Sequence, residues 1–243
     1  PIVGDAKRSL AAIIKEFRSR AKRGRPSKWL ERAKRMCKEF APRMDYDEVP
    51  IKPQRLVKEV QGVLDENAII VTEVGQCQMW AAHFYAVRKP RHFISSGGLG
   101  TMGFGLPASM GAKVACPECD VVNLAGDGSF LMNSQELATV VENEINVVSC
   151  IFNNRYLGMV KQWQDLFFQK RRSATSLGKV PDFAKLAEAY GAWGDRAARP
   201  SEVAPKLREA LRCGKPAVLD IPIDPDEHVL PMVPAGGRID QML

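Results

Sequence analysis

The chain has 243 residues, and 45% of them are hydrophobic, which is enough for one large domain, or one and a half, with a full core. No apolar run approaches the roughly 20 residues that a membrane-spanning helix needs, so a helical membrane protein is excluded. The net charge of +7 is uneven, because residues 1–40 hold 13 Lys and Arg against 4 Asp and Glu.

The amino-terminal segment predicts two helices. One should run from an Asp5 cap to about Arg20, and another from a Ser27 cap to about Phe40, with a break over residues 23–27. Residues 1–5 are typical of the end of a strand, and we expect the chain to be a piece of a longer protein.

The first predicted helix carries an apolar stripe among its basic residues. The stripe consists of Leu10, Ile13, Ile14 and Phe17. We therefore expect one face to pack and the segment to be a solvated basic connector. Because no nucleic-acid-binding motif accompanies the charge, we expect no nucleic-acid partner.

From residue 53 the sequence alternates between helix and strand patterns. The predicted helices cover residues 53–64, 76–85, 106–115, 157–169, 183–190 and 201–212. The predicted strands cover residues 68–72, 92–94 and 217–223, a stretch near Trp193, and the apolar runs that begin at Val121 and Val147. Between those runs, residues 133–141 predict another helix. This alternation predicts an α/β fold with a parallel sheet flanked by helices on both faces.

Two polar motifs lie at the ends of neighbouring predicted strands. Gly126-Asp127-Gly128 follows the first, and Asn153-Asn154 ends the second. In an open parallel sheet the ligand lies beyond such strand ends, so Asp127 and Asn154 should converge. Their oxygens suit Mg²⁺, which shares its coordination with phosphates, and glycines let the backbone approach a phosphate.

An ordinary turn with capping Asp and Asn side chains is the alternative for these motifs. A Gly-Asp-Gly sequence alone would favour that turn. The double Asn at the end of a second strand makes a metal site the better interpretation.

Together these motifs resemble the signature of thiamine diphosphate enzymes. Longer stretches narrow the resemblance to the large, catalytic subunit of acetolactate synthase (acetohydroxyacid synthase), in its C-terminal cofactor-binding domain. These stretches are residues 96–108, 153–164, 181–191 and 228–232. The resemblance runs from about Ile51 to Gly237, and its motifs are specific.

The resemblance implies which residues hold the diphosphate end of the cofactor. The metal ligands would be the side chains of Asp127 and Asn154 and the main-chain carbonyl of Tyr156. The other implied cofactor-binding residues at this end are Gly75, Gln76, Gly126, Gly128, Ser129, Leu157, Gly158 and Met159. The family usually has His at the position of Cys77, and a thiol is a poor hydrogen-bond donor to phosphate.

The aminopyrimidine end of the cofactor is expected near Gly100, Thr101 and Met102. By resemblance, Gly100 offers a backbone carbonyl to the 4′-amino group, and Met102 wedges under the cofactor and holds it bent. Taken alone, Met102 would more often be a core methionine. The glycines around it and the family resemblance favour the cofactor role.

The implied reaction decarboxylates pyruvate and transfers the two-carbon unit to pyruvate or 2-oxobutyrate, in the biosynthesis of branched-chain amino acids such as valine and isoleucine. Met159, Val160 and Trp163 share one face of a predicted helix just after the metal site. In the family this face lines the acceptor channel, and the Trp favours 2-oxobutyrate. Simple packing of Trp163 is the alternative.

Parts of the implied enzyme are not recognised in this sequence. The family activates the pyrimidine with a glutamate from an amino-terminal domain, donated across a dimer interface, and carries FAD in the full-length protein. Glu73 and Glu136 lie near the motifs, but nothing in the sequence puts either at the pyrimidine ring. We therefore expect the chain to bind thiamine diphosphate and Mg²⁺, not FAD, and to be inactive alone. The expected partners are the missing domains, further copies in a dimer or tetramer, and a small regulatory subunit.

The resemblance also predicts the domain organisation. Residues 1–22 would be the tail of a preceding central domain, and residues 23–52 a basic helical linker. Residues 53–235 would form the thiamine diphosphate-binding domain, followed by a C-terminal tail over residues 236–243.

The six cysteines include one close pair, Cys116 and Cys119, in a predicted loop. A zinc or iron–sulfur site would need further Cys or His ligands nearby, so we interpret the pair as incidental. Cys150 lies in a buried strand. The pattern suits a reducing compartment, and we expect a cytoplasmic protein.

Two other functions stay open at this point. Another thiamine diphosphate enzyme, such as a 2-oxo acid decarboxylase or an oxidoreductase subunit, would share Asp127 and Asn154, although the oxidoreductase would need more cysteines for its cluster. A non-catalytic binding subunit could keep the cofactor fold and use the basic amino terminus as its contact. The presence of Asp127, Asn154 and Met102 argues against a binding subunit that has lost its catalytic residues.

Overall fold

The computed structural model describes residues 1–21, 27–179 and 181–243. These residues form two compact units, Pro1–Pro42 and Arg43–Leu243. No helix among them is long and apolar enough to cross a bilayer.

The first unit holds α1 (Ala6–Arg20) and α2 (Lys28–Glu39). Asp5 and Ser27 cap these helices by accepting hydrogen bonds from backbone N–H groups three residues on, so both predicted starts are confirmed. Most of the predicted break lies outside the described residues.

The apolar stripe of α1 is exposed. No residue of α1 or α2 is buried, so our expectation that this face packs is wrong for the described residues of the chain. Residues 1–5 likewise form no strand, because a strand needs a hydrogen-bonded neighbour and these residues have none in the described structure.

The second unit is built on a six-stranded parallel sheet with the strand order β2-β1-β3-β4-β6-β5. The strands are β1 (Ile69–Thr72), β2 (Phe93–Ser95), β3 (Val121–Gly126), β4 (Val148–Asn153), β5 (Trp193–Arg196) and β6 (Ala217–Pro222). The central strands β3, β4 and β6 are buried along almost their whole length. Their near-continuous apolar runs suit a parallel sheet that is covered on both faces.

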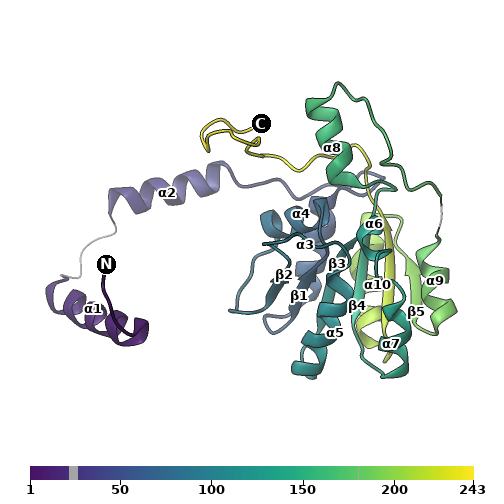
Figure 1. Cartoon of the computed structure of the whole chain (residues 1–243), viewed down its shortest axis with the longest axis horizontal. Coiled ribbons are helices and arrows are strands. Elements are labelled where there is room, and N and C mark those ends of the chain that lie inside the picture. The colour runs from purple at the N-terminus through teal and green to yellow at the C-terminus, as the bar shows by residue number, and fades with distance from the viewer. Residues whose placement is uncertain (22–26, 180) are drawn as a thin grey trace. The chain divides into compact units, whose positions relative to one another are not determined.

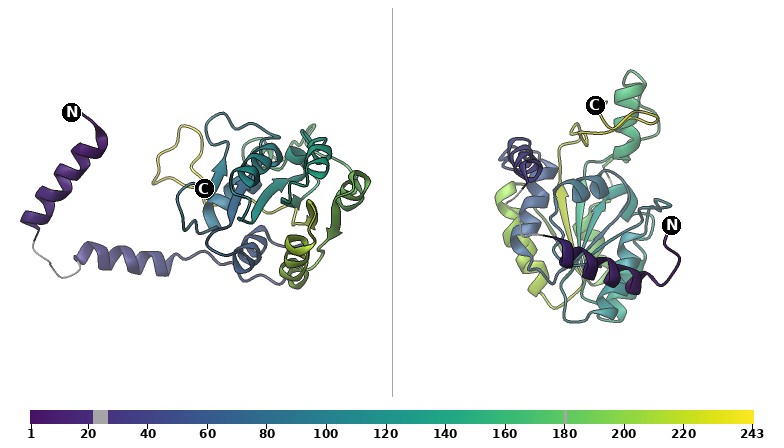
Figure 2. Two further views of the ribbon diagram at one scale, coloured as in Figure 1. Left: turned by 90° about the horizontal axis from the view of Figure 1, so that it is seen from below. Right: turned by 90° about the vertical axis from the view of Figure 1, so that its left-hand side faces the viewer.

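Helices cover both faces of this sheet, as Figure 1 and Figure 2 show. One core includes residues of α3 (Pro53–Val63), α4 (Gln76–Phe84) and α10 (Pro200–Arg212). The other includes residues of α5 (Gly105–Ala115), α7 (Glu136–Glu142) and α9 (Phe183–Tyr190). The predicted α/β fold is therefore confirmed.

Two further helices lie at the carboxyl ends of the strands. They are α8 (Gly158–Phe167), which projects beyond the sheet in Figure 1, and the short α6 (Asp127–Phe130). The sequence did not predict α6, since glycine is a poor helix former and flanks Asp127 on both sides. Phe130 anchors α6 by packing edge-on against Phe183, with ring centroids 6.0 Å apart.

The strand order creates a topological switch point between β1 and β3. The chain leaves β1 for β2 on one side and then crosses to β3 on the other. Open α/β sheets bind ligands in the crevice beyond the carboxyl ends of such strands.

Gly194 in β5 sets how closely α9 packs on the sheet. A Cβ added to Gly194 would lie 2.2 Å from the backbone oxygen of Ala184 in α9. We expect Gly194→Ala to lower the free energy of unfolding by about 2 kcal/mol, because the helix backbone must shift. Urea unfolding measures this.

Gly62 in α3 provides the matched control. A Cβ at Gly62 meets no atom within 4 Å, so Gly62→Ala should stabilise the protein by about 0.5 kcal/mol. Equal effects of the two substitutions would contradict the close-packing argument.

Candidate functional site

A cleft with an empty volume of about 500 Å³ lies at the switch point. Its walls come from the turn after β1, from the segment before α5 that contains Met102, from α6 after β3, and from the segment that joins β4 to α8. The cleft brings together most of the predicted cofactor residues, namely Gly75, Gln76, Met102, Gly126, Asp127, Gly128, Ser129, Asn154, Tyr156, Leu157, Gly158 and Met159.

The Asp127 carboxylate is held by backbone groups from two walls. Its Oδ1 accepts a hydrogen bond from the Gly128 N–H at 2.9 Å, and its Oδ2 accepts one from the Arg155 N–H at 2.6 Å. Burial raises the pKa of Asp127 to about 7, although these backbone hydrogen bonds oppose the rise. Among the residues that the structure describes, no Lys or Arg side-chain nitrogen lies within 4.0 Å of the Asp127 oxygens. A carboxylate buried in this way is suited to a bound metal ion.

Arg155 gives its N–H to Asp127 through an unusual backbone conformation. Its φ is +62°, in the left-handed region that non-glycine residues rarely adopt. Its guanidinium donates a hydrogen bond to the Pro181 carbonyl at 3.0 Å, which fixes the turn from the far side. Such strain persists only where the surroundings enforce it, and here it lies beside the polar wall of the cleft.

A chain of carboxamides orients Asn154. Its Oδ1 accepts a hydrogen bond from the Tyr156 N–H at 3.0 Å, and its Nδ2 donates to the Gln76 Oε1 at 3.1 Å. Gln76 in turn donates to Gln162 of α8 at 2.8 Å. Gln162 closes the chain by two hydrogen bonds with the backbone of Val229.

Two glycines allow the walls of the cleft to approach one another. A Cβ on Gly158 would lie 2.1 Å from the Gln76 Oε1, and a Cβ on Gly128 would lie 2.7 Å from Leu157 Cδ2. A side chain at either position would therefore force the neighbouring Gln76 or Leu157 side chain to move.

Cys77 also lines the cleft, at the start of α4. Burial raises the pKa of its thiol to about 12, so the group is neutral near pH 7. A neutral thiol is a weak hydrogen-bond donor, so the expectation that Cys77 contributes little to phosphate binding stays a prediction.

Gly100 and Thr101 lie outside the cleft lining, although the next residue, Met102, belongs to it. They form part of an exposed segment in which Gly100 has a φ of +68°. The Thr101 N–H donates to the Ser96 Oγ at 3.1 Å, which ties this segment locally.

The predicted substrate face on α8 is only partly in the cleft. Met159 and Val160 line it, whereas Trp163 stands one turn further along and is 43% exposed. The Trp163 ring packs edge-on against Phe167, with centroids 6.0 Å apart.

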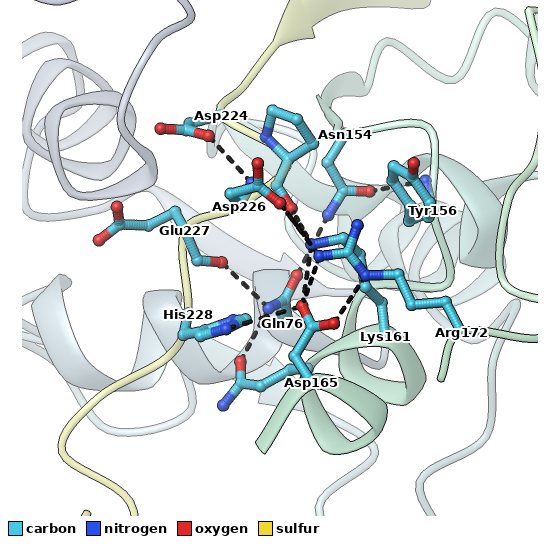
Figure 3. A network of polar contacts seen from close by, with 12 residues as sticks. Gln76, Asn154, Tyr156, Lys161, Asp165, Arg172, Asp224, Asp226, Glu227 and His228 are labelled. Carbon is cyan, nitrogen blue, oxygen red and sulfur yellow. Dashed lines mark hydrogen bonds and ion pairs between the residues drawn. The ribbon is translucent and has the colours of Figure 1, made fainter. Parts of the chain in front are cut away.

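Beside the cleft, buried charges tie α8 to the segment after β6 (Figure 3). Lys161 is 2% exposed, and its Nζ lies 3.2 Å from Asp165 and 2.8 Å from Asp226. Arg172 also contacts Asp165, at 2.6 Å. Its hydrogen bond, together with Lys161, holds the pKa of Asp165 below its ordinary value.

A second cluster of potential ligands lies away from the cleft. The ligand atoms of Cys116, Glu118 and Cys119 come within 4.8 Å of one another. A closed zinc site needs four ligands, and within the described part of the chain this turn offers three.

Sequence reasoning missed the structural roles of Glu73 and Arg155. Glu73 is fully buried behind the cleft and binds the Ser129 hydroxyl at 2.8 Å. Its position at the end of β1 was the available signal, since polar residues gather at strand ends in this fold.

Residues 73–221 match the family model of the thiamine pyrophosphate enzyme, C-terminal TPP binding domain. The chain belongs to this family. The matched range begins at the end of β1 and includes every strand end that lines the cleft.

Relatives of this thiamine pyrophosphate domain carry a more specific name. The chain is 52% identical to the probable acetolactate synthase large subunit of Methanocaldococcus jannaschii, with all of the chain and 42% of the relative covered. It is 47% identical to the protein of that name from Methanococcus aeolicus and 42% identical to the acetolactate synthase isozyme 3 large subunit of Escherichia coli, covering all of the chain and 43% of each. The chain thus spans about two fifths of these relatives.

The network around Asp165 predicts an acid-sensitive anchor for α8. The pKa of Asp165 is lower in the folded protein than its ordinary value of 3.8. Asp165 therefore contributes stability that is fully present above pH 3.8 and is lost as the pH falls through the folded pKa. We expect Asp165→Asn to lower the free energy of unfolding at pH 7 by about 2 kcal/mol and to flatten its further loss below about pH 4. Urea unfolding at neutral and acid pH measures both effects.

Asp240 supplies the control for this prediction. It pairs with Arg238 at 2.7 Å, and both side chains are more than half exposed. Asp240→Asn should leave stability nearly unchanged at both pH values. A similar loss in the two variants would argue against the buried network as the anchor.

Proposed function

We propose that the chain is the cofactor-binding domain of an acetolactate synthase and that its cleft holds thiamine diphosphate with Mg²⁺. One observation carries the proposal: Asp127, Asn154 and Met102, from three separate segments of the chain, line the same cleft at the switch point. The relatives named acetolactate synthase large subunit support it, because they match the whole chain.

The residues fit the diphosphate and its cation. Asp127 and Asn154 offer side-chain oxygens and Tyr156 a main-chain carbonyl, which are the hard ligands that Mg²⁺ prefers. Gly126 and Gly128 flank Asp127 in the lining of the cleft, where their backbone would contact the phosphate oxygens. On the opposite wall Gly75 and Gln76 open α4, whose first N–H groups suit an anion.

The other end of the cofactor would meet the segment around Met102. We infer that Gly100 and Thr101 contact the aminopyrimidine and that Met102 supports it. When bound, thiamine diphosphate supplies the electron sink for decarboxylating pyruvate and passing its two-carbon unit to a second 2-oxo acid. Val160 and Trp163 on α8 would contact that acceptor, pyruvate or 2-oxobutyrate.

The proposed enzyme includes parts outside this chain. We infer that preceding domains supply the activating glutamate and bind the FAD. Residues 1–22 would be the tail of the central domain, and residues 23–52 would link it to the cofactor domain. That domain would comprise residues 53–235, followed by a C-terminal tail over residues 236–243. Because the relatives are named as large subunits, we infer a small regulatory subunit as partner. The six free cysteines support a reducing compartment such as the cytoplasm.

Asp127→Ala tests the metal site. Removing the charged ligand should lower the Mg²⁺-dependent affinity for thiamine diphosphate by about 100-fold or more while the fold stays intact. Calorimetry and circular dichroism measure the two properties. Asp120 is an exposed residue just before the amino end of β3 and provides the control. Asp120→Ala should change neither the affinity nor the fold. Unchanged affinity in Asp127→Ala would remove the metal assignment.

Turnover tests the rest of the proposal. We expect the 243-residue chain to make essentially no acetolactate from pyruvate, since an absent acid–base group costs about 10²–10⁴-fold in rate and an open cleft admits water. Supplying the preceding domains should restore activity, and Trp163→Leu should then lower the preference for 2-oxobutyrate. Robust acetolactate production by the chain alone would contradict the proposed division of the active site.

A further inference from the structure

Glu73 is a fully buried carboxylate that the proposed mechanism does not use. It follows β1 directly and is 0% exposed. Among the residues that the structure describes, no Lys or Arg nitrogen lies within 4.0 Å of its carboxylate oxygens. A buried charge without a cation needs several hydrogen-bond donors to offset its desolvation.

The donors to Glu73 come from two different segments of the chain. Its Oε2 accepts hydrogen bonds from the Gly103 N–H at 2.9 Å and from the Ser129 hydroxyl at 2.8 Å, and its Oε1 accepts one from the Leu106 N–H at 3.2 Å. The Gly103 N–H also lies 3.2 Å from the Ser129 Oγ, so the three groups form one buried cluster.

The backbone is shaped to admit this carboxylate. A Cβ on Gly105, at the start of α5, would lie 2.8 Å from the Glu73 Cγ and Cδ. The Leu106 N–H, in the first turn of α5, donates to the carboxylate, and a negative charge is favourable at a helix N-terminus. The clearance at Gly105 depends on the length of the glutamate side chain, and the contact with the helix N-terminus depends on its charge.

Each donor segment belongs to one wall of the cleft. Gly103 directly follows Met102, and Ser129 ends the run of lining residues that begins at Gly126. Glu73 itself does not line the cleft. It is therefore placed to hold the two walls together from behind rather than to touch a ligand.

We propose that Glu73 is a positioning residue that couples the wall at the pyrimidine end to the wall at the diphosphate end. This inference rests on the proposed function, since it assigns the two walls to the two ends of thiamine diphosphate. Glu73 sets the position of Met102 relative to Asp127 and Ser129. A ligand that engages both walls depends on this coupling, whereas a ligand that engages only the diphosphate wall depends on it much less.

The test compares two ligands on the full chain in the presence of Mg²⁺. Thiamine diphosphate engages both walls, and inorganic pyrophosphate engages one. In Glu73→Gln, which keeps the side-chain size but turns an amide toward N–H donors, we expect thiamine diphosphate to lose about tenfold more affinity than pyrophosphate. Glu73→Asp keeps the charge and should show a smaller difference. Equal losses for both ligands, or no loss, would overturn the coupling.

A control and a ligand-free measurement separate this inference from the proposed function. Glu66 is an exposed residue before the amino end of β1. Glu66→Gln should leave the affinities for thiamine diphosphate and pyrophosphate unchanged. Wild-type chain that binds no thiamine diphosphate would refute the proposed function alone. Amide hydrogen exchange without ligand then tests the coupling of the two walls. Glu73→Gln should speed exchange in residues 102–106 and in residues 127–131 together. Faster exchange in only one of these segments, or in neither, would refute the coupling.

Discussion

Parallel pairing of β1, β3 and β4 is the constraint on which the site depends. Parallel strands end at the same edge of a sheet, so Gly75, Asp127 and Asn154 face one space although they are far apart in the chain. The helical layers bury both faces of the sheet, which leaves this edge as the place where polar groups gather. The fold therefore creates the cleft, and the loops give it its chemistry.

The sequence predicted the strand ends but not the contacts between them. Asp127 and Asn154 were predictable because local patterns mark the strands and one topological rule brings their ends together. The left-handed backbone conformation of Arg155 was not predictable, since no residue type there requires it. The contacts of Glu73 and Gln162 were not predictable either, because their partners lie tens of residues away in the sequence.

The exposed stripe of α1 shows a related limit of sequence patterns. Its spacing correctly predicted a helix, because periodicity follows from backbone geometry. Periodicity also indicates that one face prefers burial, but it does not identify the surface that covers that face. In α5 and α9 the sheet of the same unit covers the apolar face, and in α1 no described residue of its own unit does so.

The carboxamide chain that orients Asn154 has a consequence for how the protein folds. Gln162 reaches Val229 across 67 residues, and Val148 of β4 pairs with Ala217 of β6. Contacts so distant in sequence close late, because a long loop must first lose its conformational entropy. The pairing of β4 with β6 and the closure of the carboxamide chain therefore depend on the same distant part of the sequence, and the cleft is complete only when the segment after β6 is in place. A ligand of the cleft binds only this completed state, so the stabilisation that it confers extends to the whole unit and not only to the residues that it contacts.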